Sequence, residues 1–248
     1  MVSIKDVKEL HKKYDLDSKI CPWRTRVARK VSTYTTWLFL QTPMTPNQIT
    51  LLMYVFGFIA VFLFMFGNYF YSLLAILCMH LSFFIDHSDG EVARYRKKGS
   101  FRGYFLDLMS HTIINPLVII GISVGAYFNN PTGIPKEIFL IFGFIGAYSL
   151  MINNFVKLKR YEVYINLKEL GRLGKLRESA VEKEDAKKNI IKREILDFFK
   201  ISIFDAVFLF GILNLLPYLV FIYGVLFPLQ ALKRMYSEFK NEKNIIKY

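Results

Sequence analysis

The chain has 248 residues, of which 53% are hydrophobic and 17% aromatic, and its mean hydropathy is +0.29. These values exclude an average soluble domain and favour a protein embedded in a membrane. The formal net charge is +13, and the Lys and Arg residues cluster beside apolar runs. This distribution favours membrane lipids or an anionic substrate as partners, and no nucleic-acid-binding motif accompanies the charge.

The first element expected along the chain is an amphipathic helix that precedes the membrane spans. Apolar and aromatic residues recur there at spacings of three and four, with cations between them: Trp23, Val27, Val31, Tyr34, Trp37 and Leu38. This pattern predicts a helix lying in the membrane interface, where aromatic rings suit the depth and cations can pair with lipid phosphates. A cytoplasmic cap packed on the bundle would show the same amphipathicity, so that alternative stays open.

Six stretches follow that are long and apolar enough for transmembrane helices, each of which needs ~20 largely apolar residues. They lie near residues 48–67, 69–88, 104–128, 137–156, 198–215 and 217–233. Each crossing must be helical, because hydrocarbon offers the backbone no other hydrogen-bond partner. The sequence therefore predicts an all-α, polytopic membrane protein with six transmembrane helices.

The distribution of charge among the connections predicts the orientation and the domains. Connections on one side carry almost no Lys or Arg, so the positive-inside rule places both termini in the cytoplasm. The expected location is therefore an integral membrane protein, in the cell membrane if the source is prokaryotic. A run of alternating charge near 157–197 predicts a solvated cytoplasmic helix or loop. The expected division is an N-terminal cytoplasmic or interfacial segment, 1–44, a transmembrane domain, 45–235, and a cytoplasmic tail, 236–248.

Acidic side chains enter the membrane at one hairpin, between the second and third spans. Asp86 and Asp89 are three residues apart, and Asp107 and His111 are four apart, so each pair shares one face of its helix. Ionisable groups at membrane depth are costly unless they are paired, bound to metal or placed in a wet cavity. Carboxylates converging at this hairpin therefore predict a functional site, with a divalent cation as the compensating charge.

Small residues and an arginine accompany these acids. Gly90, Ala93 and Gly103 remove side-chain bulk and would let a flat base or a phosphate approach the helix backbone. Arg94 keeps its charge and could bind a phosphate through two hydrogen bonds. Helix packing alone could explain the small residues, but it does not explain the acids.

The hairpin resembles the signature of the CDP-alcohol phosphotransferase family. Residues 86–111 follow the pattern D-x2-D-G-x2-A-R-x8-G-x3-D-x3-H, and the family signature is D-x2-D-G-x2-A-R-x8-G-x3-D-x3-D, so only His111 departs from it. The segment Thr45-Pro46-Asn47-Gln48-Ile49-Thr50 is similar to a second family motif at the start of the first span. Six spans with cytoplasmic termini are also typical of the family.

This resemblance implies a membrane transferase that moves a substituted phosphate from a CDP-linked donor, such as CDP-diacylglycerol or a similar CDP-lipid, to an alcohol acceptor with release of CMP. It implies two divalent ions, Mg²⁺ or Mn²⁺, and a homodimer within the membrane lipids. The implied metal ligands are Asp86, Asp89, Asp107 and, through its nitrogen, His111. The candidate nucleotide-binding residues are Gly90, Ala93, Arg94, Gly103 and Asn47.

His111 stands where the family has its last aspartate, which is the presumed general base, and three interpretations compete. An imidazole can accept a proton at neutral pH, since its unperturbed pKa is about 6.5. It could instead ligate a metal and shift the preference away from Mg²⁺. Alternatively, the protein could be a catalytically lapsed membrane subunit that still binds CDP. A small transporter is a further interpretation, but it would spread charges through several spans.

Four other polar residues receive weaker predictions. We expect His80 to bond within the helix bundle, and Asp205 either to bind an acceptor hydroxyl or to join a salt bridge. We expect His87 and Glu91 to face away from the acids, although Glu91 follows Gly90 closely enough for an outer-shell role.

Overall fold

The computed structural model describes residues 2–14, 23–129, 132–169 and 203–245, and all regular structure within these ranges is helical. The all-α prediction is confirmed. Most of the charged segment expected near 157–197 lies outside the described residues. The helices are α1 (Ile4–Lys13), α2 (Trp23–Leu40), α3 (Pro46–Met65), α4 (Tyr69–Arg96), α5 (Phe101–Phe128), α6 (Lys136–Glu169), α9 (Ile203–Ile212) and α10 (Leu216–Ile245).

Within the described ranges, five helical segments are long and apolar enough to cross a membrane. They are Pro46–Met65, Tyr69–Arg96, Phe101–Phe128, Lys136–Val156 and Leu216–Ser237. The sixth expected span, near 198–215, falls on α9, which is an apolar helix of 10 residues in the described part. At ~1.5 Å per residue those ten cover ~15 Å, about half of a hydrocarbon core.

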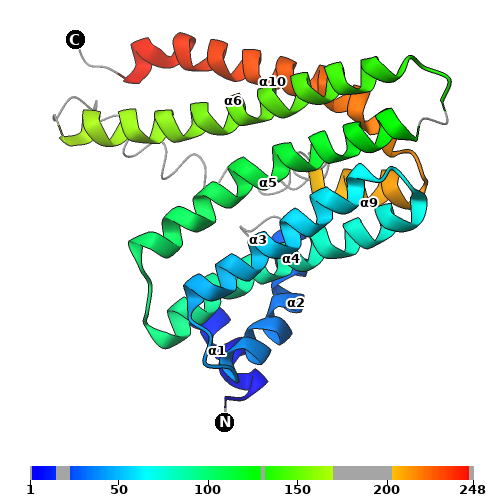
Figure 1. The fold of residues 1–248 in the computed structure, drawn as a ribbon. Helices are drawn as coiled ribbons and strands as arrows, with labels where there is room; N and C mark the ends of the chain where they lie inside the picture. The colour runs from blue at the N-terminus through cyan, green and yellow to red at the C-terminus, as the bar shows by residue number, and fades with distance from the viewer. Residues whose placement is uncertain (1, 15–22, 130–131, 170–202, 246–248) are drawn as a thin grey trace.

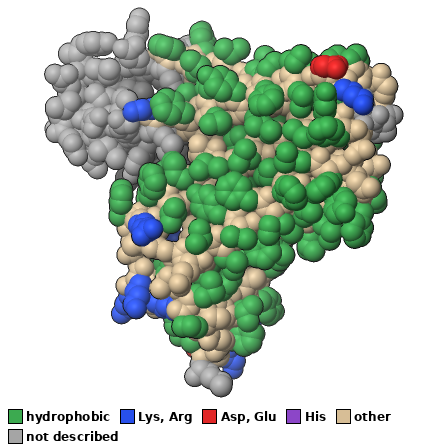
Figure 2. Space-filling model, viewed as in Figure 1, with side chains coloured by type: hydrophobic (Ala, Val, Ile, Leu, Met, Phe, Trp, Pro, Cys, Tyr) green, Lys and Arg blue, Asp and Glu red, His purple; other side chains and the backbone are tan. Residues whose placement is uncertain are grey.

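The surface of the bundle agrees with a membrane setting. Figure 2 shows a face covered mainly by apolar side chains, with Lys and Arg gathered toward the end that carries α1 and the α4–α5 connection. Water would make so large an apolar surface unfavourable, whereas lipid tails cover it at no cost. The five apolar helices therefore support an integral membrane protein, and the cytoplasmic position of the termini stays a prediction.

The helices pack in an order that brings α4 and α5 together at the predicted hairpin. In Figure 1, α6 and α10 lie side by side, α5 packs on α6 and α3, and α4 lies against α3, α2 and α9. Buried side chains from six helices form the main core, among them Phe64, Met79, Ile119, Val207 and Leu219. The acidic ends of α4 and α5 lie beyond this core, at the end of the bundle where α1 and α2 pack.

Glycines let α3 and α5 approach closely at the opposite end of the bundle. Gly67, with a φ of +62°, closes the turn after α3, and a side chain there would collide with the backbone of Gly125. A Cβ at Gly121 would lie 2.7 Å from the carbonyl oxygen of Val61. Contacts this short require glycine, as is common between helices in membranes.

Helix α2 presents different faces to the bundle and to its surroundings. Four residues of the predicted apolar stripe are exposed: Val27, Val31, Tyr34 and Leu38. The opposite face is buried, with Ala28, Ser32 and Thr36 packed toward the bundle, where α2 contacts α4. Packing on the bundle and an outward apolar stripe therefore occur together, and the stripe is available for a membrane interface.

Candidate metal and nucleotide site

Capping side chains fix the helix ends that border the hairpin. Helix α4 ends at Arg96, and the left-handed backbone of the following Lys97 (φ 53°) stops the helix. Ser100 precedes α5 and accepts a hydrogen bond from Gly103 N–H at 3.0 Å. Helix α3 begins with a capping box in which Thr45 and Gln48 bond each other's backbone N–H. The Thr45-Pro46-Asn47-Gln48 sequence is therefore a helix-start signal as well as a family motif.

Three of the four predicted metal ligands come together. Asp86 of α4 and Asp107 and His111 of α5 each offer a ligand atom, and these atoms lie within 4.8 Å of one another. His111 Nε2 lies 3.6 Å from Asp86 Oδ2. Asp86 is mostly buried, whereas the side chain of His111 is 49% exposed. The cluster can therefore be reached from outside at His111.

The unused bonding capacity of this cluster suits a divalent cation. Asp86 Oδ1 is buried, and no described residue donates a hydrogen bond to it. A buried carboxylate oxygen without a donor is unfavourable, and a second carboxylate nearby adds repulsion. A cation between Asp86, Asp107 and His111 would remove both costs. The carboxylate oxygens suit Mg²⁺ or Mn²⁺, and an imidazole nitrogen among the ligands would shift the preference away from Mg²⁺.

Asp89 is not one of the three clustered ligands. It is buried, and its Oδ2 accepts a 2.5 Å hydrogen bond from Thr50 Oγ1 of α3. Sequence reasoning left Thr50 without a role, although Thr50 closes the second family motif. The motif could have drawn attention to Thr50. Only the packing of α3 against α4 shows that its hydroxyl donates to Asp89.

The candidate nucleotide-binding residues lie in two groups. On α4, a side chain at Gly90 would lie 3.3 Å from Arg94 Nη1, so the glycine leaves room beside an exposed guanidinium. Where α3 and α5 begin, a Cβ at Gly103 would lie 2.7 Å from Asn47 Oδ1. Ala93 is partly buried on α4. Gly90 thus lies beside Arg94, and Gly103 lies beside Asn47. The resemblance implies nucleotide binding for all four residues.

A small pocket joins the acidic cluster to α9. Asp86 and His111 line it together with apolar side chains and with Phe204, the neighbour of Asp205 in the first turn of α9. Asp205 is partly buried, and whether it binds an acceptor hydroxyl or joins a salt bridge stays a prediction.

The weaker histidine predictions have different outcomes. His80 Nδ1 lies 2.8 Å from the carbonyl oxygen of Ile76 on its own helix, and its ring packs against Phe208 of α9. His87 Nδ1 lies 3.0 Å from the carbonyl oxygen of Phe83, yet it is also 4.0 Å from Asp86 Oδ2. His87 is therefore closer to the acids than we expected.

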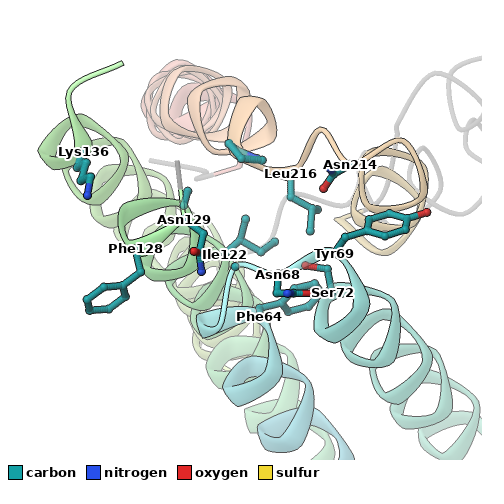
Figure 3. A pocket seen from close by; sticks show the side chains of 13 residues that line it. Phe64, Asn68, Tyr69, Ser72, Ile122, Phe128, Asn129, Lys136, Asn214 and Leu216 are labelled. Atoms are coloured by element: carbon teal, nitrogen blue, oxygen red, sulfur yellow. The ribbon is translucent and has the colours of Figure 1, made fainter. Parts of the chain in front are cut away.

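A larger pocket, of about 540 Å³, lies at the other end of the bundle. Figure 3 shows Asn68, Asn129, Asn214 and Lys136 reaching this hollow from different elements. Two of these side chains already make hydrogen bonds to the backbone. Asn68 accepts from Phe70 N–H, and Asn129 donates to the Phe66 carbonyl. The pocket lacks the acids of the hairpin, so the candidate site is the Asp86–Asp107–His111 cluster.

An all-helical bundle with apolar spans and acids at one hairpin defines a membrane protein with a candidate metal site at the end of two spans. The family model described as CDP-alcohol phosphatidyltransferase matches residues 43–227, well over half of the chain. The protein belongs to this family, which indicates transfer of a phosphate-linked group from a CDP-alcohol. A search of curated proteins found no match.

Proposed function

We propose that the protein transfers a substituted phosphate from a CDP-linked lipid, such as CDP-diacylglycerol, to an alcohol acceptor, and releases CMP in a reaction that depends on Mg²⁺ or Mn²⁺. The supporting observation is the cluster of Asp86, Asp107 and His111 at the family signature, with a buried Asp86 oxygen that has no donor among the described residues. Five helices long and apolar enough to cross a membrane support a lipid as the donor.

The reaction balances with one bond made and one broken. The acceptor oxygen attacks the phosphorus that carries the lipid, and the bond from that phosphorus to the oxygen of CMP breaks. The acceptor loses its hydroxyl proton, and CMP leaves with the electrons of the broken bond. Divalent ions held by Asp86, Asp89 and Asp107 would supply charge neutralisation on the pyrophosphate. Arg94 would bind phosphate oxygens, and Asn47 would contact the nucleotide through its side chain. The small residues Gly90, Ala93 and Gly103 would let the nucleotide approach the helix backbone.

His111 would take the proton from the acceptor hydroxyl. Its imidazole is half exposed, so an acceptor can reach it from outside. Asp86 lies 3.6 Å from Nε2 and would stabilise the imidazolium that forms. One nitrogen cannot hold a metal and accept a proton at the same time, so the base and ligand roles exclude each other at Nε2.

The experiment is CMP release by the purified, detergent-solubilised protein, given CDP-diacylglycerol and a pool of polar alcohols with Mg²⁺ or Mn²⁺. Metal-dependent CMP release that is lost in His111→Ala and largely kept in His111→Asp supports the transferase with His111 as the base. The matched control is His80→Ala, since His80 bonds its own helix and should leave the rate near wild type.

The lapsed CDP-binding subunit is the alternative, because His111 replaces the last acid of the signature. It predicts metal-dependent binding of CDP without CMP release from a broad panel of donors and acceptors. The homodimer implied by the resemblance has no support in the single chain and stays a prediction.

A further inference from the structure

A second carboxylate lies two residues beyond Asp89 on α4, and it is fully buried. Glu91 accepts hydrogen bonds from two hydroxyls of α2: Ser32 Oγ donates to Oε1 at 2.8 Å, and Thr36 Oγ1 donates to Oε2 at 2.6 Å. His11 Nε2 of α1 lies 3.1 Å from Oε2, and neither side chain is more than 2% exposed. Groups from two helices thus surround one carboxylate.

Further contacts hold α1 in place beside this carboxylate. Val7 is completely buried in an apolar cluster shared with α2, α3 and α4. The carbonyl oxygen of Val2 accepts hydrogen bonds from Trp37 Nε1 at 3.1 Å and from Gln41 Nε2 at 2.8 Å. A helix of ten residues has little stability of its own, so these contacts define where α1 lies and where it presents His11.

Glu91 and Asp89 point to different sides of α4. With ~3.6 residues per turn, two residues apart means a rotation of ~200° about the helix axis. Thr50 of α3 bonds Asp89 on one side, and the groups of α1 and α2 bond Glu91 on the other. The rotation of the last turns of α4 is therefore held from both sides.

We infer that Glu91 and His11 are positioning residues, which fix the rotation of α4 so that Asp86 and Asp89 are correctly placed for divalent metal. The inference rests on the proposed metal-dependent function. Burying Glu91 and His11 costs free energy that two apolar side chains in their place would avoid. What the polar pair adds is therefore a defined orientation of α4, set by its hydrogen bonds. Helix α1 is then part of the metal site without contacting the metal.

The test uses Mn²⁺ itself as the probe, titrated into the purified full-length protein in detergent, with free Mn²⁺ followed by electron paramagnetic resonance. His11→Ala should weaken Mn²⁺ binding about 10-fold, as loss of a group that orients a metal ligand does. His11→Gln should recover most of the affinity, because its amide nitrogen can donate to Glu91. The matched control is Lys12→Ala, the exposed neighbour on α1, which should bind Mn²⁺ like wild type.

A kinetic measurement separates positioning from simple loss of folded protein. In His11→Ala the Mn²⁺ concentration for half-maximal CMP release should rise about 10-fold, and saturating Mn²⁺ should restore most of the rate. Partial unfolding would lower the rate at every Mn²⁺ concentration and leave the half-maximal concentration unchanged. If His11→Ala does not fold, Thr36→Val removes one donor with little change of shape and should weaken Mn²⁺ binding in the same direction.

Two failures can be told apart. Equal Mn²⁺ affinity in wild type, His11→Ala and Thr36→Val would overturn the positioning inference and leave the proposed function standing. A wild-type protein that binds no Mn²⁺ would overturn the metal site of the proposed function, and the inference with it.

Discussion

The last turns of α4 carry carboxylates in two contrasting surroundings. Asp86 lies beside Asp107 and His111, and one of its buried oxygens has no donor among the described residues. Glu91, five residues later, is surrounded by Ser32, Thr36 and His11. A carboxylate whose oxygens all accept hydrogen bonds stabilises the packing of the helices around it. Clustered carboxylates with an oxygen that accepts none are suited to bind a cation. Burial alone would not have separated the two, because both side chains are largely buried.

The strongest test of this comparison removes an acid from the open cluster. Asp107→Asn should lower CMP release about 1,000-fold, because a metal site contributes several kcal/mol to catalysis and each ~1.4 kcal/mol is tenfold. Without metal, the same change should keep or raise the melting temperature, since it relieves repulsion between two carboxylates. The CMP assay measures the loss of activity, and thermal melting in chelator measures the stability. A clearly lower melting temperature of Asp107→Asn would contradict the view that Asp86 and Asp107 repel each other without metal.

Removing the carboxylate of Glu91 should have the opposite effect. Glu91→Ala leaves two hydroxyls and His11 buried without their acceptor, so it should destabilise the fold by about 3 kcal/mol. Thermal melting in detergent measures this effect, with Glu9→Ala on the exposed face of α1 as the control. An unchanged melting temperature would show that Glu91 does not stabilise the packing of α1 and α2.

Two arginines two residues apart sharpen the comparison further. Arg94 is exposed beside Gly90, so Arg94→Ala should lower kcat/KM about 30-fold, or ~2 kcal/mol, through loss of phosphate contacts, with little change in stability. Arg96 donates to the carbonyls of Phe39, Thr42 and Met44, so Arg96→Ala should mainly lower the melting temperature. Both variants are compared by kcat/KM for CMP release and by thermal melting. A loss of stability in Arg94→Ala together with a loss of kcat/KM in Arg96→Ala would contradict the roles assigned to the two arginines.

The smallest expected effect concerns Asp89. Thr50→Val keeps the side-chain shape but removes the hydrogen bond to Asp89, so it should weaken Mn²⁺ binding about 10-fold. Ser123→Ala is the control, because the Ser123 hydroxyl donates to the Ile119 carbonyl of its own helix. Equal Mn²⁺ binding by Thr50→Val and wild type would mean that Asp89 needs no orientation from α3.

Much of the fold was predictable because lipid imposes simple rules. An uncharged apolar run must become a helix in hydrocarbon, so the spans, the all-α class and the acidic hairpin follow from local sequence. The last predicted pair of spans was harder, since the described part of α9 is short and its neighbouring residues 198–202 lie outside the description.

The sequence by itself determined the helical membrane fold, the family signature and the pairing of Asp107 with His111, because helical spacing and chain order are local properties. Only the tertiary structure decided that Asp86 joins this pair while Asp89 bonds Thr50, and that Glu91 bonds α1 and α2. The physical reason is that a hydrogen bond between helices depends on their rotation and relative height. Both are set by packing over the whole bundle, which no local pattern records.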